Sequence, residues 1–287
     1  MQQIANKNSL YLRIFLVTIA VVTKRKGDNM IVDLDPQVIT ILILLGFLAA
    51  FIDSVVGGGG LIALPALLFV GLNPTTAVAT NKLAGTMGSF TSVISFYRSG
   101  KLDFKSVVKY FPIAFVGSLV GAWTVTLISP EILKPIMLIM LASVGVYTIF
   151  KKDWGGSTTI KQLSLVRILG LIVLLFAIGF YDGFLGPGTG SFFIFTFLML
   201  GYDFLKAAGN AKFLNLGSNF AALLMFVYLN EIHFVYGFIM GFAQIFGAIV
   251  GTKFAIKKGG TFVRKLFIIV TITLLIKNTI DFLSARH

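Results

Sequence analysis

The sequence predicts an all-α integral membrane protein made of two repeated halves, inverted relative to each other. Three observations predict it: apolar residues come in long blocks, charged residues are scarce, and motifs of the first half recur in the second. Charged residues make up 12% of the chain, against about 25% in a soluble domain. The blocks show no alternation of apolar and polar residues, so membrane helices are expected rather than a barrel.

The apolar blocks predict about 8–10 hydrophobic segments, since a helix needs roughly 17–25 residues to cross the hydrocarbon. The second block of each half is too short for a comfortable span and follows a glycine-rich run that should break the helix. The ten blocks are 38–56, 61–70, 77–97, 107–128 and 132–150 in the first half, and 166–185, 191–200, 213–229, 235–256 and 262–283 in the second.

Residues 1–29 form an N-terminal extension before these blocks. Its apolar run, 14–22, is flanked by basic residues and is too short to span. Three interpretations stay open: a signal-peptide core, an interfacial helix, and an extension absent from a native product that begins at Met30. The first transmembrane repeat is expected over residues 30–155 and the second over 156–287.

Matched motifs define the repeat. Residues 53–60 read Asp-Ser-Val-Val-Gly-Gly-Gly-Gly and residues 182–189 read Asp-Gly-Phe-Leu-Gly-Pro-Gly-Thr. After a slip of one residue, the offset between the halves stays constant through several separate motifs, which chance rarely produces. These later matches are 77–82 with 207–212, 100–104 with 230–234, and the Gly-x-x-x-Gly pairs 117–121 with 247–251.

Loop charges predict how the halves lie in the membrane. If all five blocks cross in each half, the loops 98–109, 151–167, 201–206 and 253–265 share one side and hold 14 lysines and arginines, whereas the opposing internal loops hold only Lys134. Positive loops stay in the cytoplasm, so an odd number of crossings inverts the second half. Re-entrant short blocks would make the halves parallel and put the basic residues of 253–265 outside. Charge therefore favours inversion in the cell (inner) membrane.

The glycine-rich runs are the first candidate binding site. Each glycine weakens a helix by about 1 kcal/mol, and unwound backbone at membrane depth is tolerated only when protein buries it or it lines a cavity. Paired helix breaks in inverted repeats indicate a transport site near the midplane, with helix N-termini that attract anions. Helix packing through small residues is the alternative. The candidate residues are Gly57, Gly58, Gly59, Gly60, Gly186, Gly188, Thr189 and Gly190.

Two symmetric pairs of charges accompany these runs. Asp53 and Asp182 could carry a proton, cap the following short helix, or lie at the interface. Lys82 and Lys212 could contact an anionic substrate, pair with the aspartates, or snorkel to water. Polar residues on the same spans complete the predicted substrate site, as a polar path or as helix-helix contacts: Thr80, Asn81, Asn210, Asn215 and Asn219.

Several function classes lack their residues. The chain has no cysteine, and His233 and His287 lie in a loop and at the terminus, so no metal cluster or embedded Ser-His pair is indicated. No P-loop is present. The net charge of +13 indicates basic loops that stay in the cytoplasm rather than nucleic-acid binding. We therefore expect no enzyme, no cofactor and no nucleic-acid partner, but a small anionic solute, the lipid bilayer and an open possibility of homo-oligomers.

The two glycine-rich motifs, Pro65, the stretch 77–82 and the two Gly-x-x-x-Gly pairs resemble those of the sulfite exporter TauE/SafE family, over nearly the whole chain from Met30. The second glycine motif departs from the family pattern at Pro187 and Thr189. The resemblance implies transport, often export, of small sulfur-containing anions such as sulfite or organosulfonates. The alternatives are uptake or permeation of another small solute, and a membrane scaffold subunit that transports nothing.

Overall fold

The computed structural model describes residues 35–133, 135–136 and 164–258, and these form helices and connecting turns without a strand. Five helices are long and apolar enough to cross a membrane: Pro36–Val56, Phe104–Thr126, Leu165–Phe184, Phe204–Tyr228 and Phe234–Lys258. The elements are α2 (Pro36–Val56), α3 (Gly60–Phe69), α4 (Pro74–Arg98), α5 (Phe104–Val107), a 3₁₀ turn η1 (Val108–Tyr110), α6 (Phe111–Thr126), α8 (Leu165–Phe184), α9 (Thr189–Met199), α10 (Phe204–Tyr228) and helix 234–258.

The described helices match eight of the ten predicted blocks, and the largest difference is the start of α10. The block was predicted from residue 213, but the helix begins at Phe204. Lys206, Asn210 and Lys212 lower the local hydropathy and hide the first two turns. Asp203 sets the start, because its carboxylate accepts a hydrogen bond from the Lys206 N–H at 3.0 Å.

The short helices α3 and α9 follow helix breaks, as predicted. Gly57 ends α2 in the left-handed conformation at φ 82°, and Gly188 precedes α9 at φ 79°, a backbone conformation that glycine adopts without steric cost. The predicted blocks 132–150 and 262–283, the N-terminal extension and the boundary at residues 155–156 fall wholly or mostly outside the described residues.

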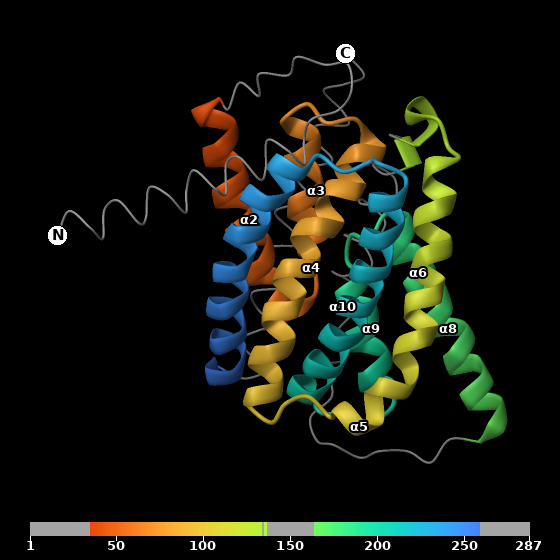
Figure 1. Cartoon of the computed structure of the whole chain (residues 1–287). Helices are drawn as coiled ribbons and strands as arrows, with labels where there is room; N and C mark the ends of the chain where they lie inside the picture. The colour runs from red at the N-terminus through yellow and green to blue at the C-terminus, as the bar shows by residue number, and fades with distance from the viewer. Residues whose placement is uncertain (1–34, 134, 137–163, 259–287) are drawn as a thin grey trace, which may run out of the picture.

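The helices form one bundle, and elements that the predicted repeat would match run in opposite directions (Figure 1). α2 begins at the upper end and α8 begins at the lower end of the view. α4 ends beside α5 at the lower end, whereas α10 leads to the upper connection before helix 234–258, which descends again. The ends of α2 and α8 approach each other inside the bundle.

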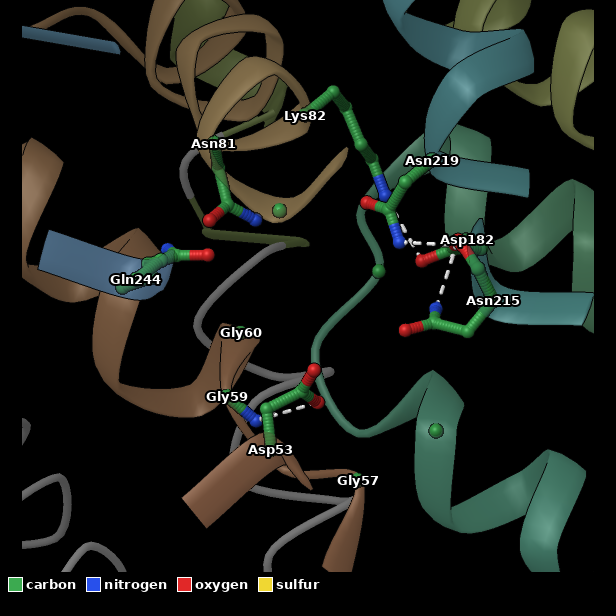
Figure 2. A pocket seen from close by; sticks show the side chains of 14 residues that line it. Asp53, Gly57, Gly59, Gly60, Asn81, Lys82, Asp182, Asn215, Asn219 and Gln244 are labelled. Atoms are coloured by element: carbon green, nitrogen blue, oxygen red, sulfur yellow. Dashed lines mark hydrogen bonds and ion pairs between the residues drawn. The ribbon is translucent and has the colours of Figure 1, made fainter. Parts of the chain in front are cut away.

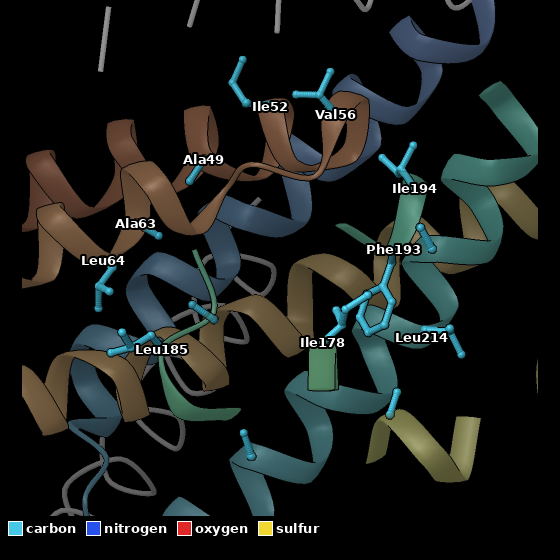
Figure 3. Close-up of a cluster of buried hydrophobic side chains, with 14 of the residues drawn as sticks. Ala49, Ile52, Val56, Ala63, Leu64, Ile178, Leu185, Phe193, Ile194 and Leu214 are labelled. Carbon is cyan, nitrogen blue, oxygen red and sulfur yellow. The ribbon is translucent and has the colours of Figure 1, made fainter. Parts of the chain in front are cut away.

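Apolar side chains from both parts of the chain form the core (Figure 3). It surrounds the short helices α3 and α9, which are buried along most of their length. Its members include Ala49, Ile52, Val56, Ala63, Leu64, Ile178, Leu185, Phe193, Ile194 and Leu214. The core therefore holds the two helix breaks at the centre of the molecule.

Two glycine seams join the long helices. Gly117 and Gly121 of α6 lie against the carbonyl oxygens of Phe176 and Phe180 of α8, so closely that no Cβ would fit. The predicted Gly-x-x-x-Gly packing face is thus present in this half, and small residues let the two backbones approach.

The second seam has the same construction. Gly247 and Gly251 of helix 234–258 lie against the carbonyl oxygens of Phe47 and Phe51 of α2. In each seam, a late helix of one half packs on the first helix of the other half. The two halves are therefore interlocked rather than placed side by side.

Candidate functional site

The two glycine-rich breaks touch each other. The backbone of Gly57 packs on that of Gly190, and a Cβ on either residue would collide with the other. Ser191 fixes this contact, because its N–H donates to the Gly57 carbonyl at 3.2 Å and its hydroxyl donates to the Val56 carbonyl at 2.8 Å. Unwound backbone from both halves thus meets inside the protein, where lipid does not reach it.

Each aspartate beside a break forms an ion pair with the lysine of the other half. Lys82 Nζ lies 2.9 Å from Asp182 Oδ1, and Lys212 Nζ lies 2.6 Å from Asp53 Oδ2. Both lysines are buried, with exposed fractions of 1% and 0%, so neither extends to water. The structure thus forms the predicted pairs, and the pairing crosses between the halves.

The surroundings of the two carboxylates differ. Asp182 also accepts hydrogen bonds from Asn215 Nδ2 and from the Ser218 hydroxyl, and only 2% of its side chain is exposed. Asp53 accepts one further bond, from the Gly59 N–H at 3.2 Å, and 24% of its side chain is exposed. Asp53 thereby caps the start of α3, one of the roles predicted for it.

A cavity of about 30 Å³ opens where the breaks and ion pairs meet (Figure 2). This volume holds about two water molecules. Figure 2 shows Asn81 and Gln244 on one side, Lys82, Asp182 and Asn215 on the other, and Asp53 at a third. The lining residues are Asp53, Gly57, Gly59, Gly60, Ala63, Asn81, Lys82, Gly85, Asp182, Gly186, Gly190, Asn215, Asn219 and Gln244.

Two carboxamides in this lining have no partner. Asn81 and Gln244 are 7% and 5% exposed, and neither side-chain amide has a hydrogen-bond partner among the described residues. The fully enclosed side-chain atoms without a partner among the described residues are Asn210 Nδ2 and Thr252 Oγ1, so the amides of Asn81 and Gln244 are not sealed in protein but face the cavity that they line. Asn219 differs, because its amide nitrogen donates to the Asn215 carbonyl at 2.8 Å. The free amides of Asn81 and Gln244 can therefore bind a polar molecule in the cavity.

Sequence reasoning placed most of these residues together and missed Ala63, Gly85 and Gln244. Gln244 is an isolated polar residue on an apolar span, and that isolation is the sequence signal that could have found it. Gly85 lies at the position that matches Asn215 in the predicted repeat, and this match is the sequence signal that could have placed Gly85 in the site. Ala63 offers no signal in sequence. Predicted site residues that do not line the cavity are Gly58, Thr80, Gly188, Thr189, Asn210 and Lys212.

Thr80 and Asn210 instead hold loops of the opposite half. The His233 N–H donates to Thr80 Oγ1 at 3.0 Å, and the Asp103 N–H donates to Asn210 Oδ1 at 2.9 Å. Both polar side chains satisfy backbone groups where a connection enters the bundle. Their geometry suits a structural role, and substrate contact by either residue stays a prediction.

The described part of the chain offers no group of three or more His, Cys, Asp or Glu residues that could hold a metal ion. The site is chemically a set of paired charges, carboxamides and backbone N–H groups. Such a set can bind and orient a small polar solute. Together with the five helices of the described residues that are long and apolar enough to span a bilayer, it indicates a multi-pass membrane protein with a polar cavity between its helices.

Comparison with known proteins identifies the family. The model of the family described as "Sulfite exporter TauE/SafE" matches residues 42–278. The chain is 37% identical over 251 residues to the probable membrane transporter protein ORF9 of Sinorhizobium sp, covering 87% of this chain and 95% of the relative. It is 34% identical over 250 residues to a probable membrane transporter protein of Haemophilus influenzae, covering 87% and 97%. The chain therefore belongs to the sulfite exporter TauE/SafE family of membrane transporters.

A third relative is the probable membrane transporter protein YfcA of Escherichia coli strain K12, 34% identical over 247 residues, with 85% of this chain and 90% of the relative covered. No solved structure matches the chain. The predicted family and the multi-pass membrane location are confirmed by these comparisons and by the apolar spans.

Proposed function

We propose that this protein is a permease that exports a small oxyanion, sulfite or an organosulfonate, and that the cavity between the helix breaks is its binding site. The observation that carries the proposal is the pair of buried carboxamides, Asn81 and Gln244, without hydrogen-bond partners in a cavity that Lys82 also lines. Amide N–H groups and an ammonium are the donors that suit an oxyanion.

The start of the short helices supports an anion as well. Gly60 and Gly190 line the cavity at the first turns of α3 and α9, and neither backbone N–H donates to an oxygen of the described residues. A helix N-terminus carries roughly half a positive charge. An anion between the two breaks would therefore meet positive potential from both halves.

The size of the cavity supports a moving site. A sulfite ion has four heavy atoms and needs more room than the two waters that about 30 Å³ accommodates, so the lining must separate to admit it. We propose that the halves are inverted repeats that rock against each other around the glycine breaks to give alternating access. The opposed directions of α2 and α8 and the matched seams support this arrangement.

Binding to purified protein tests the substrate class. Sulfite and small sulfonates should raise the melting temperature in a dose-dependent way, with about 2.7 kcal/mol of stabilisation at 100 times the dissociation constant. Gln244→Leu and Asn81→Leu should abolish this shift, whereas Lys105→Gln, at an exposed position of the short helix α5, should leave it unchanged. Protection by cations or neutral solutes, with none from a broad panel of oxyanions, would contradict the proposal. A protein that no solute protects and no variant alters would favour the scaffold alternative.

Cysteine labelling tests the inverted arrangement, because the chain has no native cysteine. In intact cells an impermeant maleimide should label Glu131→Cys and Glu231→Cys and should not label Lys105→Cys or Lys257→Cys. The first and third of these positions lie in the first half and the others in the second. Labelling of Lys257→Cys together with Glu131→Cys would show parallel halves and overturn the arrangement.

A further inference from the structure

We propose that Asp53, and not its counterpart Asp182, is a proton-binding site that couples proton uptake to anion binding. The inference rests on the proposed function, since the ligand that would compete for the freed lysine is the anionic cargo. Its basis is a difference between two ion pairs that the repeat would otherwise make equivalent.

Asp182 is enclosed by donors. Its two carboxylate oxygens accept hydrogen bonds from Lys82, Asn215 and Ser218, and only 2% of the side chain is exposed. The Ser218 hydroxyl has a second acceptor in the Asn215 carbonyl at 3.2 Å, but the Lys82 ammonium and the Asn215 amide have no other acceptor among the described residues, and a proton arriving at this carboxylate would weaken both bonds. Removing such bonds from buried groups costs their full desolvation.

Asp53 lacks this enclosure, and the sequence gives the reason. With the constant offset of the repeat, the positions that match Asn215 and Ser218 are Gly85 and Gly88. Neither glycine has a side chain to donate to Asp53. Gly85 lines the cavity, and Asp53 lies at the cavity wall with 24% of its side chain exposed. Water in the cavity can therefore reach this carboxylate.

The charged groups around Asp53 define what its protonation would do. Lys212 of α10 lies 2.6 Å away, and Lys82 of α4 and Asp182 of α8 line the same cavity as a second pair. Of the other elements against this end of α2, α3 and α9 carry no ionisable side chain. Helix 234–258, which contacts Phe51 through Gly251 and Phe254, carries Lys253, Lys257 and Lys258, and all three are exposed. A proton taken from cavity water converts the Asp53 carboxylate to a neutral acid and leaves the Lys212 ammonium without its counter-ion.

Lys212 does not itself line the cavity, so its uncompensated ammonium attracts the anion from behind the neutral Asp53 side chain. One proton enters at Asp53 and one monovalent anion, a sulfonate or bisulfite, replaces the lost negative charge, so the charge of the site is balanced. Because linkage is reciprocal, a proton that favours the anion is itself favoured by the anion to the same degree. Binding affinity for the anion should then fall by about tenfold for each pH unit above the protonation range of Asp53.

Infrared difference spectroscopy on the purified protein tests which carboxylate protonates, and it needs no cargo. Acidification should produce the C=O band of a protonated carboxyl that is absent in Asp53→Asn and retained in Asp182→Asn. The conservative Asp53→Glu keeps the carboxyl in the folded protein and should shift the frequency of the band, whereas Asp182→Glu should not. If the carboxyl band that appears first on acidification is absent in Asp182→Asn or shifts in Asp182→Glu, the proposal is overturned.

Calorimetry then tests the coupling. Methanesulfonate stays a monoanion at all working pH values, so protons taken up on its binding come from groups of the protein. Its binding to the wild type, measured in buffers of different ionisation enthalpy, should show uptake of about one proton for each anion. Asp53→Asn should bind methanesulfonate without proton uptake and with an affinity independent of pH. Binding of methanesulfonate by the wild type without proton uptake overturns the coupling. If no oxyanion binds while the infrared band belongs to Asp53, the proposed cargo is wrong and the proton site stands.

Discussion

The two glycine seams are alike, whereas the two central ion pairs are not. In both seams a pair of glycines lies against the carbonyl oxygens of two phenylalanines of the opposite half. In the ion pairs, one carboxylate is 2% exposed and accepts three side-chain donors, and the other is 24% exposed and accepts one lysine and one backbone N–H. The two parts of the chain are alike where the helices pack and differ where the cavity lies.

This contrast separates scaffold from site. Close backbone packing tolerates no added atoms, so the same solution serves both seams. The walls of the cavity are not held to one packing solution in this way, and the two carboxylates there have different neighbours. Substitutions in the two regions should therefore give symmetric effects in the seams and unequal effects at the ion pairs.

The largest expected effect is in the seams. Gly121→Leu and Gly251→Leu each place a side chain where the carbonyl oxygen of Phe180 or Phe51 lies, and backbone cannot move aside as a flexible side chain does. Each should lower the free energy of unfolding by more than about 4 kcal/mol, and both should lose folded protein in detergent extracts measured by size-exclusion chromatography. The matched control is Gly170→Leu on α8, where no atom lies within 4 Å. Loss in only one seam would break the symmetry argument.

The next effect should distinguish the ion pairs. Lys82→Gln leaves Asp182 buried without its ammonium, which costs about 3–5 kcal/mol. Lys212→Gln leaves Asp53, which is 24% exposed and can be hydrated, so its cost should be about half as large. Chemical denaturation in detergent measures both. Equal losses for the two variants would contradict the difference in enclosure.

A smaller effect is expected at a place where the seams themselves differ. Ser118 of α6 donates a hydrogen bond to the Ser218 carbonyl, and its counterpart in helix 234–258 is Ala248. Ser118→Ala copies the second half and removes one buried hydrogen bond, so unfolding should become easier by about 1 kcal/mol. Thermal melting monitored by circular dichroism measures this loss. A loss of several kcal/mol would assign Ser118 to the site rather than the seam.

The smallest expected effect is a pH dependence at a loop. Burial lowers the pKa of His233 below its usual value, so the folded state binds the proton less readily than the unfolded state. The stability that this residue contributes is present above about pH 6.5 and is lost as pH falls toward the lowered pKa. His233→Gln should flatten that part of the stability profile by less than about 1 kcal/mol. An unchanged profile would mean that other groups cause the acid sensitivity.

Much of this architecture is readable in the sequence because it depends on local patterns. The helix breaks at Gly57 and Gly186, the short helices after them and the packing glycines follow from composition and spacing. The predicted start of α10 was wrong because the prediction used hydropathy, which does not detect a capping residue such as Asp203. The partners of Lys82 and Lys212 were left open, since pairing across the halves depends on how α4 and α10 cross, which no single segment specifies.

The crossed pairing also bears on how the protein enters the membrane. The partner of Lys82, Asp182, lies 100 residues later in the chain, and the partner of Asp53, Lys212, lies 159 residues later. At roughly 5–20 residues per second of synthesis, Lys82 spends about 5–20 s without its counter-ion, and Asp53 waits longer still. Until α8 and α10 have been synthesised, Lys82 and Asp53 therefore lack the ion-pair partners that they have in the folded protein. During that interval, other polar groups or water in the insertion machinery must solvate them.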